Sequence, residues 1–210
     1  MFITFEGLDG SGKTTQFHRL ASWLREQDFD VLALREPGGT PIGEAVRDIV
    51  HDHAHAEMDA RAELLLYCAS RAQLTAQRIK PHLDKGGVVL CDRFADSTLA
   101  YQGFGRGLDL AFLRMLLQFA TRTIRPDLSL YFDVSLAVGL KRRSAGGEWN
   151  RLDAESLEFH GRVAQGYQAL IAAEPNRWQI IDGTPAIDQV TLSMIEHVNT
   201  WLHKKDLQKS

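Results

Sequence analysis

The stretch "FEGLDGSGKTT", residues 5–15, follows a short run of β-forming residues and precedes a helical pattern. Residues 7–14 match the spacing GxxxxGK[ST] in the strand-to-helix setting that this motif requires. Glycines allow backbone angles closed to other residues, so successive amide N–H groups can line an anion cavity at a helix N-terminus. We therefore predict a phosphate-binding loop. A glycine-rich turn that only joins strand to helix is the alternative.

The loop offers groups for a nucleoside triphosphate and for its metal ion. Lys13 is expected to reach the β- and γ-phosphates, and the hydroxyl group of Thr14 to coordinate the Mg²⁺ ion that bridges them. The backbone of the loop is expected to surround the phosphates. The predicted nucleotide contacts in this loop are Gly7, Leu8, Asp9, Gly10, Ser11, Gly12, Lys13, Thr14 and Thr15.

Strand-like and helix-like segments alternate along the chain. Short apolar runs predict strands at 2–6, 31–35, 87–92, 128–134 and 178–182. Longer segments with helical periodicity lie between and after them, among them 62–79 and 185–202, and Thr184 followed by Pro185 predicts an N-cap and first turn. Nearly continuous apolar strands are typical of a parallel sheet covered on both faces. The pattern therefore predicts an α/β protein with a P-loop NTPase fold, a five-stranded parallel sheet flanked by helices.

Composition limits the class of protein further. The 210 residues, 44% of them hydrophobic, suit a single domain spanning 1–210, and the formal net charge of −3 gives no general attraction to nucleic acid or anionic membranes. Cys68 and Cys91 lie inside apolar stretches, as expected of buried reduced thiols. No stretch reaches the roughly 18 apolar residues of a membrane span, and the N-terminus has no export signal pattern. We expect a cytoplasmic protein without nucleic-acid or membrane partners.

A second predicted strand ends in a charged pair. The run "VVLCDRF" ends at Asp92, in the place of a Walker B carboxylate near the metal ion, and Arg93 follows. A purely structural ion pair is the alternative for these two residues. A GTPase would carry N-K-x-D after a buried strand, whereas "NRLD" at 150–153 has Arg for Lys and follows a polar segment. We interpret that match as coincidence.

Arginines gather near predicted strand ends and in one polar segment. The segment "RRSAGGEWNR", residues 142–151, is basic and poor in core residues, and we expect a mobile surface lid at about 142–152. Arginines offset the repulsion between two phosphorylated substrates with bidentate geometry. A solvated surface charge is the alternative for each of them. The candidates are Arg35, Arg71, Arg93, Arg142, Arg143 and Arg151.

One helical turn separates Tyr67 from Arg71 in "LLLYCASRAQ". On a helix the two side chains share a face, where they could stack on and hydrogen-bond to a planar base. Core packing is the alternative for the tyrosine.

His51 and His55 have the i, i+4 spacing of a metal pair on a helix. Their alanine and acidic neighbours favour a solvated connection between helices.

Four blocks together resemble thymidylate kinase of the bacterial type, over nearly the whole chain. They are "FEGLDGSGKTT", "REPGGT" at 35–40, "LLLYCASRAQ" at 64–73 and "DRFADSTLAYQGFGRG" at 92–107. The resemblance implies transfer of the γ-phosphoryl group of ATP to dTMP with Mg²⁺, giving dTDP for the synthesis of dTTP. It implies substrate contacts from Asp9, Arg35, Pro37, Tyr67, Arg71, Arg93, Ser97, Thr98, Tyr101 and Gln102.

The resemblance also implies how the base and sugar are recognised. Tyr67 would stack on thymine and Arg71 would bond its O4 atom. Thr98 and Gln102 would complete the recognition of the base edge. Tyr101 would crowd the 2′ position of the sugar and so favour a deoxyribonucleotide.

The phosphates and the metal ion would have their own contacts. By resemblance, Asp9 would lie near the sugar 3′ hydroxyl group and the metal ion, and Arg35 and Arg93 would hold the acceptor phosphate. The predicted metal ligands are Thr14 and Asp92.

In this family the transition-state arginine comes either from the P-loop or from the lid. The variable loop positions 8–11, "LDGS", contain no basic residue. The resemblance therefore implies the lid-donated arrangement, with Arg151 as the best match and Arg143 or Arg142 as further contributors, Arg142 on the ATP side. The implied catalytic residues are Lys13, Asp9, Arg93, Arg151 and Arg143.

The implied partners are the small molecules dTMP and ATP and a second copy of the chain. The apolar face of 108–120 or of 58–79 could form a homodimer interface, or either could be core. Two other functions stay open. One is a different P-loop nucleoside or nucleoside-monophosphate kinase, and the other is a nucleotide-gated binding module without acceptor-dependent turnover.

Overall fold

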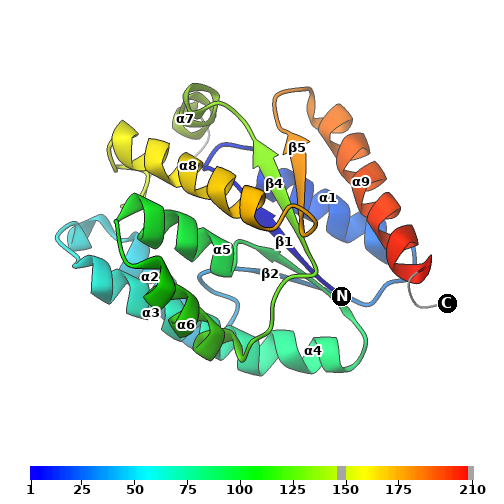
Figure 1. Cartoon of the computed structure of the whole chain (residues 1–210), viewed down its shortest axis with the longest axis horizontal. Coiled ribbons are helices and arrows are strands. Elements are labelled where there is room, and N and C mark those ends of the chain that lie inside the picture. Colours follow the sequence, from blue (N-terminus) through cyan, green and yellow to red (C-terminus); the bar gives the residue numbers. More distant parts are fainter. Residues whose placement is uncertain (146–149, 208–210) are drawn as a thin grey trace.

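The computed structural model describes residues 1–145 and 150–207. Their centre is a parallel sheet with the strand order β2-β3-β1-β4-β5 (Figure 1). The strands are β1 Phe2–Glu6, β2 Val31–Arg35, β3 Val88–Asp92, β4 Leu128–Asp133 and β5 Trp178–Asp182. The predicted five-stranded parallel sheet is confirmed, although the strands predicted at 87–92 and 128–134 are each one residue too long.

Helices fill the connections between strands. They are α1 Lys13–Glu26, α2 Pro41–His51, α3 Ala60–Leu74, α4 Lys80–Asp84, α5 Ala95–Thr98, α6 Leu110–Thr121, α7 Leu136–Ala145, α8 Leu157–Ala173 and α9 Ile187–Leu207. A 3-10 turn, η1, spans His53–His55, and two π-helical segments, η2 and η3, span Thr75–Ile79 and Leu99–Gly105. Among the helices of the described residues, none has the length and apolar character needed to span a bilayer.

Several helices begin at caps that the sequence encodes. The side chains of Thr40, Asp59, Asp109 and Ser156 each accept a hydrogen bond from a backbone N–H group in the first turn of the helix that follows. Such caps satisfy amide groups that have no partner inside the helix. These capping side chains therefore help to set where the four helices begin.

The predicted cap at Thr184 is wrong. Helix α9 begins at Ile187, and both the backbone N–H and the hydroxyl group of Thr184 donate to Oδ1 of Asp182, at 2.9 and 2.7 Å. Aspartate favours such a local turn.

His51 and His55 do not share a helix, since His51 ends α2 and His55 lies in η1. Residues 146–149 of the predicted lid lie outside the described residues.

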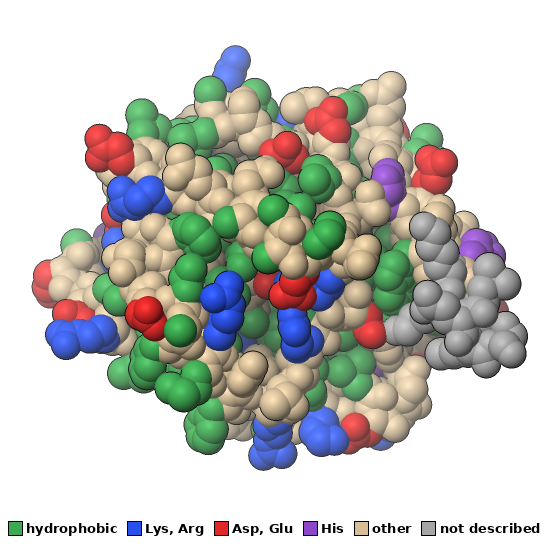
Figure 2. Space-filling view, viewed as in Figure 1, with side chains coloured by type: hydrophobic (Ala, Val, Ile, Leu, Met, Phe, Trp, Pro, Cys, Tyr) green, Lys and Arg blue, Asp and Glu red, His purple; other side chains and the backbone are tan. Residues whose placement is uncertain are grey.

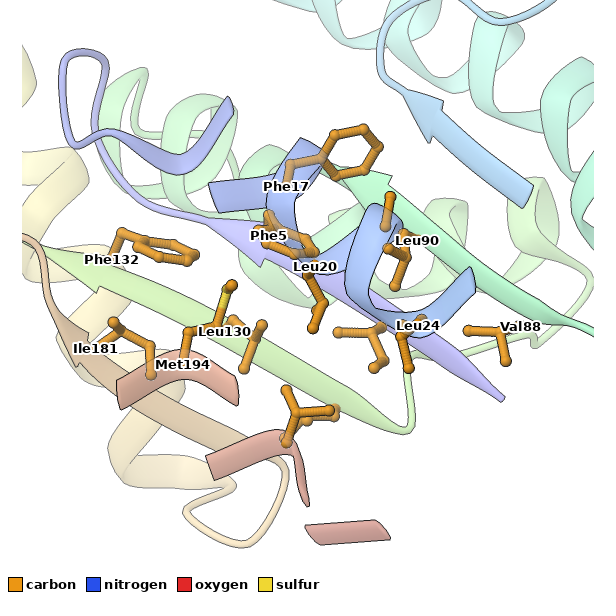
Figure 3. Packing of buried hydrophobic residues seen from close by; sticks show 14 of the residues in the cluster. Phe5, Phe17, Leu20, Leu24, Val88, Leu90, Leu130, Phe132, Ile181 and Met194 are labelled. Atoms are coloured by element: carbon orange, nitrogen blue, oxygen red, sulfur yellow. The ribbon is translucent and has the colours of Figure 1, made fainter. Parts of the chain in front are cut away.

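The sheet is covered on both faces (Figure 1). On one face, α1 and α9 pack against β1, β3, β4 and β5 in a cluster that includes Phe5, Leu20, Leu24, Phe132 and Met194 (Figure 3). On the other face, residues of α3, η3, α6 and α8 form a second cluster against the sheet. Burial on both faces explains why the strands are nearly continuous in apolar residues.

The carboxyl ends of the central strands meet at one edge of the sheet. In the strand register, Asp92 of β3 pairs with Phe5 of β1 and with Arg35 of β2. The phosphate-binding loop follows β1 at this same edge. Parallel α/β sheets bind ligands at the carboxyl ends of their strands. The fold thus brings Arg35 of β2 and Asp92 of β3 together with the predicted loop that follows β1.

Leu24→Ala tests the sheet face covered by α1. Leu24 has no exposed surface, so the cavity left by the substitution is expected to lower the free energy of unfolding by about 2–5 kcal/mol in urea denaturation. Leu192→Ala is the matched control, because that side chain is 69% exposed and its loss should change the free energy by about 0.5 kcal/mol or less. Equal losses in the two variants would contradict the described packing.

Candidate active site

A cavity of about 260 Å³ opens at the carboxyl ends of β1, β2 and β3. The predicted site residues that line it are Asp9, Lys13, Thr14, Arg35, Pro37, Tyr67, Arg71, Asp92, Arg93, Ser97, Thr98, Tyr101, Gln102 and Arg143. Residues that were not among the predicted site residues also line it, namely Glu36, Arg47, His51, Asn150 and Leu152. The predicted triphosphate side and the predicted acceptor side therefore share one cavity.

The phosphate-binding loop has a backbone that requires glycine. Gly10 and Gly12 have φ angles of +76° and +89°. A Cβ atom on Gly10 would lie 2.0 Å from the carbonyl oxygen of Gly139 in α7, and one on Gly7 would lie 2.8 Å from that of Phe132. Gly12 precedes α1 without a side-chain cap, so the first N–H groups of the helix can meet an anion.

The side chains of the loop surround a basic centre. The Nζ atom of Lys13 donates to the carbonyl oxygen of Leu8 at 3.3 Å and lies 3.6 Å from Oδ1 of Asp9. Burial lowers the pKa of Lys13, and the nearby Arg93 lowers it further. Within the described residues, the buried hydroxyl group of Ser11 has no hydrogen-bond partner. Thr15 is exposed on α1.

Two oxygen ligands for a cation meet beside the loop. The hydroxyl group of Thr14 donates to Oδ2 of Asp92 at 3.0 Å. The other carboxylate oxygen, Oδ1, is buried and has no hydrogen-bond partner within the described residues. Mg²⁺ binds oxygen ligands and commonly takes one or two protein carboxylates, with water and phosphates as the rest. The donor set of Thr14 and Asp92 therefore fits this ion.

Arg93 is fixed at the centre of the cavity. Its φ angle is +68°, and its Nη2 atom donates to Oδ1 of Asp9 at 2.8 Å and to the hydroxyl group of Tyr101 at 3.2 Å. Its Nη1 atom donates to Ser97 and Tyr167 at 3.2 and 3.4 Å. Burial alone would lower the pKa of this guanidinium, but the Asp9 carboxylate, Tyr101, Tyr167 and Asp92 together outweigh burial and hold it well above the ordinary value.

Asp9 stays ionised in the same surroundings. Burial alone would raise the pKa of its carboxyl group, but the charges of Arg93 and Lys13 outweigh burial and hold the pKa well below the ordinary value. The hydroxyl group of Tyr101 also donates to Asp9, at 3.2 Å. A negative charge is therefore maintained between two cations.

Glu6 lies beneath this centre, fully buried at the end of β1. Its carboxyl group accepts hydrogen bonds from the backbone N–H of Phe94 at 3.0 Å, from Ser97 at 2.6 Å and from Tyr167 at 3.0 Å. Burial, and next the charge of Asp96, raise the pKa of Glu6 to about 8. Because Ser97 and Tyr167 also contact Arg93, Glu6 supports the turn that carries this arginine.

The predicted acceptor side of the cavity holds an aromatic ring and a buried guanidinium. The Nε atom of Arg71 donates to Glu36 at 2.7 Å, Nη1 donates to Thr98 at 2.9 Å, and Nη2 donates to the carbonyl oxygen of Phe94 at 3.1 Å. Tyr67, one turn earlier on α3, packs in a cluster with Val46, Val50 and Leu152. Both Tyr67 and Arg71 nevertheless line the cavity, as their spacing predicts.

Two further arginines, Arg35 and Arg47, also line the cavity. Arg35 donates to Glu44 at 2.8 Å and to the carbonyl oxygen of Pro37 at 3.1 Å. Arg47 on α2 donates to the same carbonyl oxygen at 3.1 Å. The backbone of residue 37 therefore holds two guanidinium groups at the cavity.

The three arginines of the predicted lid lie in different places. Arg143 lines the cavity and pairs with Asp153 at 2.6 Å. Arg142 donates to the carbonyl oxygen of Gly183 at 2.7 Å, in the loop after β5. Arg151 forms an ion pair with Glu63, donates to the carbonyl oxygen of Val50 at 3.0 Å, and does not line the cavity.

The expectation of a surface segment is wrong for residues 151 and 152, and the adjoining Asp153 is also buried. Arg151, Leu152 and Asp153 are buried, with 4–9% of their surface exposed. The physical reason is charge pairing, because Glu63 holds Arg151 and Arg143 holds Asp153. The catalytic role predicted for Arg151 stays a prediction.

Sequence reasoning missed the buried carboxylates. Glu6, Glu36 and Glu63 are each 4% exposed or less. An acidic residue inside an apolar stretch, as in "FITFE" and "AELLL", is the signal that could have found two of them, because charged side chains are rarely buried unless paired.

A five-stranded parallel sheet, with the predicted phosphate-binding loop after β1 and a cavity at the carboxyl ends of its strands, has the fold of the P-loop nucleoside-monophosphate kinases. The family model for thymidylate kinase matches residues 5–194. The chain therefore belongs to the thymidylate kinase family.

Known relatives agree with this assignment. A thymidylate kinase of Roseiflexus sp. (strain RS-1) is 50% identical over 200 residues, which cover 90% of this chain and 88% of the relative. A thymidylate kinase of Oceanobacillus iheyensis is 43% identical over 208 residues, covering 98% and 92%. The crystal structure of thymidylate kinase from Ehrlichia chaffeensis matches with a TM-score of 0.75 and 35% identity, covering 94% of this chain and 98% of that one.

Glu6→Gln tests the buried carboxyl group through pH. An acid whose pKa is raised on folding stabilises the native state at low pH, and this stabilisation is lost as the pH rises through the folded pKa, here about 8. From pH 5 to 8, the unfolding free energy of the wild type should fall relative to that of Glu6→Gln, by up to about 1.4 kcal/mol per pH unit.

The matched control is Glu57→Gln, at an exposed carboxylate. Urea denaturation at each pH gives the three free energies. We expect the control to follow the wild type. A constant difference between the wild type and Glu6→Gln across this range would refute the protonated state of Glu6.

Proposed function

We propose that this chain transfers the γ-phosphoryl group of ATP to the 5′ phosphate of dTMP, giving dTDP and ADP, in the supply of dTTP in the cytoplasm. The observation that carries the proposal is the single cavity that Lys13 and Asp92 share with Tyr67 and Arg71. Arg93 lies between the two sides, with Asp9 beside it. A donor phosphate and an acceptor phosphate could therefore meet at this arginine.

The acceptor nucleotide would lie along the ring of Tyr67. Arg71 is placed to hydrogen-bond a base oxygen, since a guanidinium has only donors. Arg35 and Arg93 would hold the 5′ phosphate, and Tyr101 lies against Arg93 with its ring centroid 5.0 Å from the guanidinium carbon. This position supports the proposed contact of Tyr101 with the sugar.

On the donor side, the loop amides and Lys13 would bind the β- and γ-phosphates. Thr14 and Asp92 would hold a Mg²⁺ ion, which neutralises phosphate charge when bound. Arg142, bonded to the loop after β5, would contact ATP. Arg143 lines the cavity, so we propose it as a contributor to the transition state.

Arg151 could join the transition state only by leaving Glu63, so its proposed role includes a movement of the segment that carries it. An arginine that completes a phosphoryl-transfer site can raise the rate by about 10³–10⁵-fold. This gain is equivalent to about 4–7 kcal/mol. It is comparable to the roughly 3–5 kcal/mol that breaking a buried ion pair costs.

The reaction needs no strong general base, because the attacking phosphate oxygen is already anionic. Positioning and charge must therefore provide the rate, and well-oriented reactants can gain about 7–11 kcal/mol through effective molarity. Lys13, Arg93 and Arg143 would stabilise the charge that spreads over the transferred group. Closure over ATP would exclude water, which would otherwise accept the phosphoryl group.

An acceptor panel tests the reaction and the base choice together. ADP release should depend on dTMP and be weaker with dUMP, dCMP, dGMP and thymidine. Lys13→Ala should lower kcat by about 10²-fold or more, since a donor to the transition-state charge is lost. The matched control Lys80→Ala removes a lysine that is paired with Asp84 on α4, and should leave kcat unchanged.

Other outcomes would support the two alternatives. Turnover of thymidine but not of dTMP would indicate a nucleoside kinase. Tight ATP binding without any acceptor-dependent ADP release would indicate a binding module. Either result would overturn the proposed reaction.

We propose further that the chain forms a homodimer through α3 and α6. Large hydrophobic side chains are exposed on these helices: Leu65 is 57% exposed, Met115 61% and Phe119 83%. Figure 2 shows hydrophobic side chains at lower left, where α6 lies in Figure 1. Exposed apolar surface of this kind is typical of a protein interface.

Phe119→Lys tests this interface. A charge at this exposed aromatic position should shift the mass measured by light scattering after gel filtration from dimer to monomer. Leu192→Lys, at an exposed leucine on α9, is the matched control and should remain dimeric. A wild-type protein that is monomeric at micromolar concentration would contradict the proposed dimer.

A further inference from the structure

One buried carboxylate joins the acceptor side of the cavity to two distant segments. Glu63 on α3 has no exposed side-chain surface. Its oxygens accept hydrogen bonds from Nε2 of Gln102 at 2.8 Å, from Nη2 of Arg106 at 3.0 Å and from Arg151. Three donors from outside α3 therefore converge on a single acidic group.

These donors keep Glu63 ionised. Burial alone would raise the pKa of its carboxyl group, but the hydrogen bonds from Arg106 and Gln102 outweigh burial and lower the pKa. An ionised carboxylate has acceptors only. Arg106 and Arg151 have donors only, so neither could replace the carboxylate as an acceptor for the amide of Gln102.

The orientation of the Gln102 amide follows from this chemistry. Turning the amide by half a rotation would place its carbonyl oxygen against the carboxylate, where two acceptors repel each other. Its NH₂ group therefore faces Glu63. Gln102 is almost fully buried yet lines the cavity, and no hydrogen bond to its Oε1 atom exists within the described residues. The carbonyl oxygen remains as an acceptor for a ligand.

Beside this acceptor lies a donor. Arg71 contacts Glu36, Thr98 and Phe94, which leaves at least one of its five N–H bonds for a ligand. Thr98 and Gln102 are four residues apart on the continuous α5–η3 segment. The cavity thus offers a donor at Arg71 and an acceptor at Gln102.

We propose that Glu63 is a positioning residue for base selection, because it holds the Gln102 amide with its oxygen toward the base. A pyrimidine with a ring N3–H beside a C4 carbonyl matches this pair of donor and acceptor. Cytosine presents an amine at C4 and an unprotonated N3, so both contacts would be mismatched. The inference rests on the proposed function and explains which pyrimidine edge, defined by the groups at N3 and C4, that site accepts.

Glu63→Gln tests the inference, with dTMP and 5-methyl-dCMP as a substrate pair that differs only at this edge. An amide at position 63 can donate as well as accept, so Gln102 can turn either way. The ratio of kcat/KM for dTMP to that for 5-methyl-dCMP should fall by about tenfold to a hundredfold. Glu155→Gln is the matched control, because Glu155 also pairs with Arg106, at 2.6 Å, and should keep the wild-type ratio.

A purely structural role for Glu63 would lower both kcat/KM values together, and an unchanged ratio would overturn the inference. The Gln102→Leu background gives a second test, since adding Glu63→Gln to it should not change the ratio further. Absence of dTMP turnover in the wild type would instead overturn the proposed function. The two failures are therefore distinguishable.

A measurement on the wild type removes the dependence on how well the variant folds. In nitrogen-15 NMR spectra with dTMP bound, assigned with Gln102→Leu, one side-chain amide proton of Gln102 should exchange slowly with solvent because it is bonded to Glu63. Fast exchange of both amide protons would overturn the inference.

Discussion

The cavity depends on the pairing of its central cations with carboxylates. Arg93 has Asp9, Arg71 has Glu36, and Asp9 also lies near Lys13. For the fully buried pair of Arg71 and Glu36, removing one partner is expected to cost about 3–5 kcal/mol, because a charge is left buried without compensation. The carboxylates therefore make it possible to gather several positive groups where two phosphorylated nucleotides would meet. An arriving phosphate can then provide negative charge at the same cations.

The fold also has to bring these charged side chains close to one another. Parallel strands deliver Asp92 and Arg35 to one edge of the sheet, where the phosphate-binding loop also begins. The glycines of that loop allow α7 to pack directly against it, since any side chain at Gly10 would meet Gly139. Arg143 on α7 is thereby brought to the cavity. The sheet topology and the glycine backbone of the loop therefore together determine which side chains reach the cavity.

The sequence alone predicts the parts of this account that depend on local pattern. The alternation of strands and helices, the loop at 7–15 and the shared helix face of Tyr67 and Arg71 are all visible within short stretches. The charge pairs are not visible in this way, because their members lie far apart in the chain, as with Glu63 and Arg151, and only the tertiary fold joins them. The same limit explains why residues 151 and 152 look like the end of a polar surface segment in the sequence and are buried in the structure.

The central claim is that both nucleotides share one cavity and meet at Arg93. A crystal structure with dTMP and a non-hydrolysable ATP analogue tests it most directly. The account predicts the thymine ring against Tyr67 with Arg71 at its edge, the 5′ phosphate on Arg93, and the analogue's phosphates in the loop at 7–15. Density for dTMP at any other place, with the Tyr67 side of the cavity empty, would contradict it.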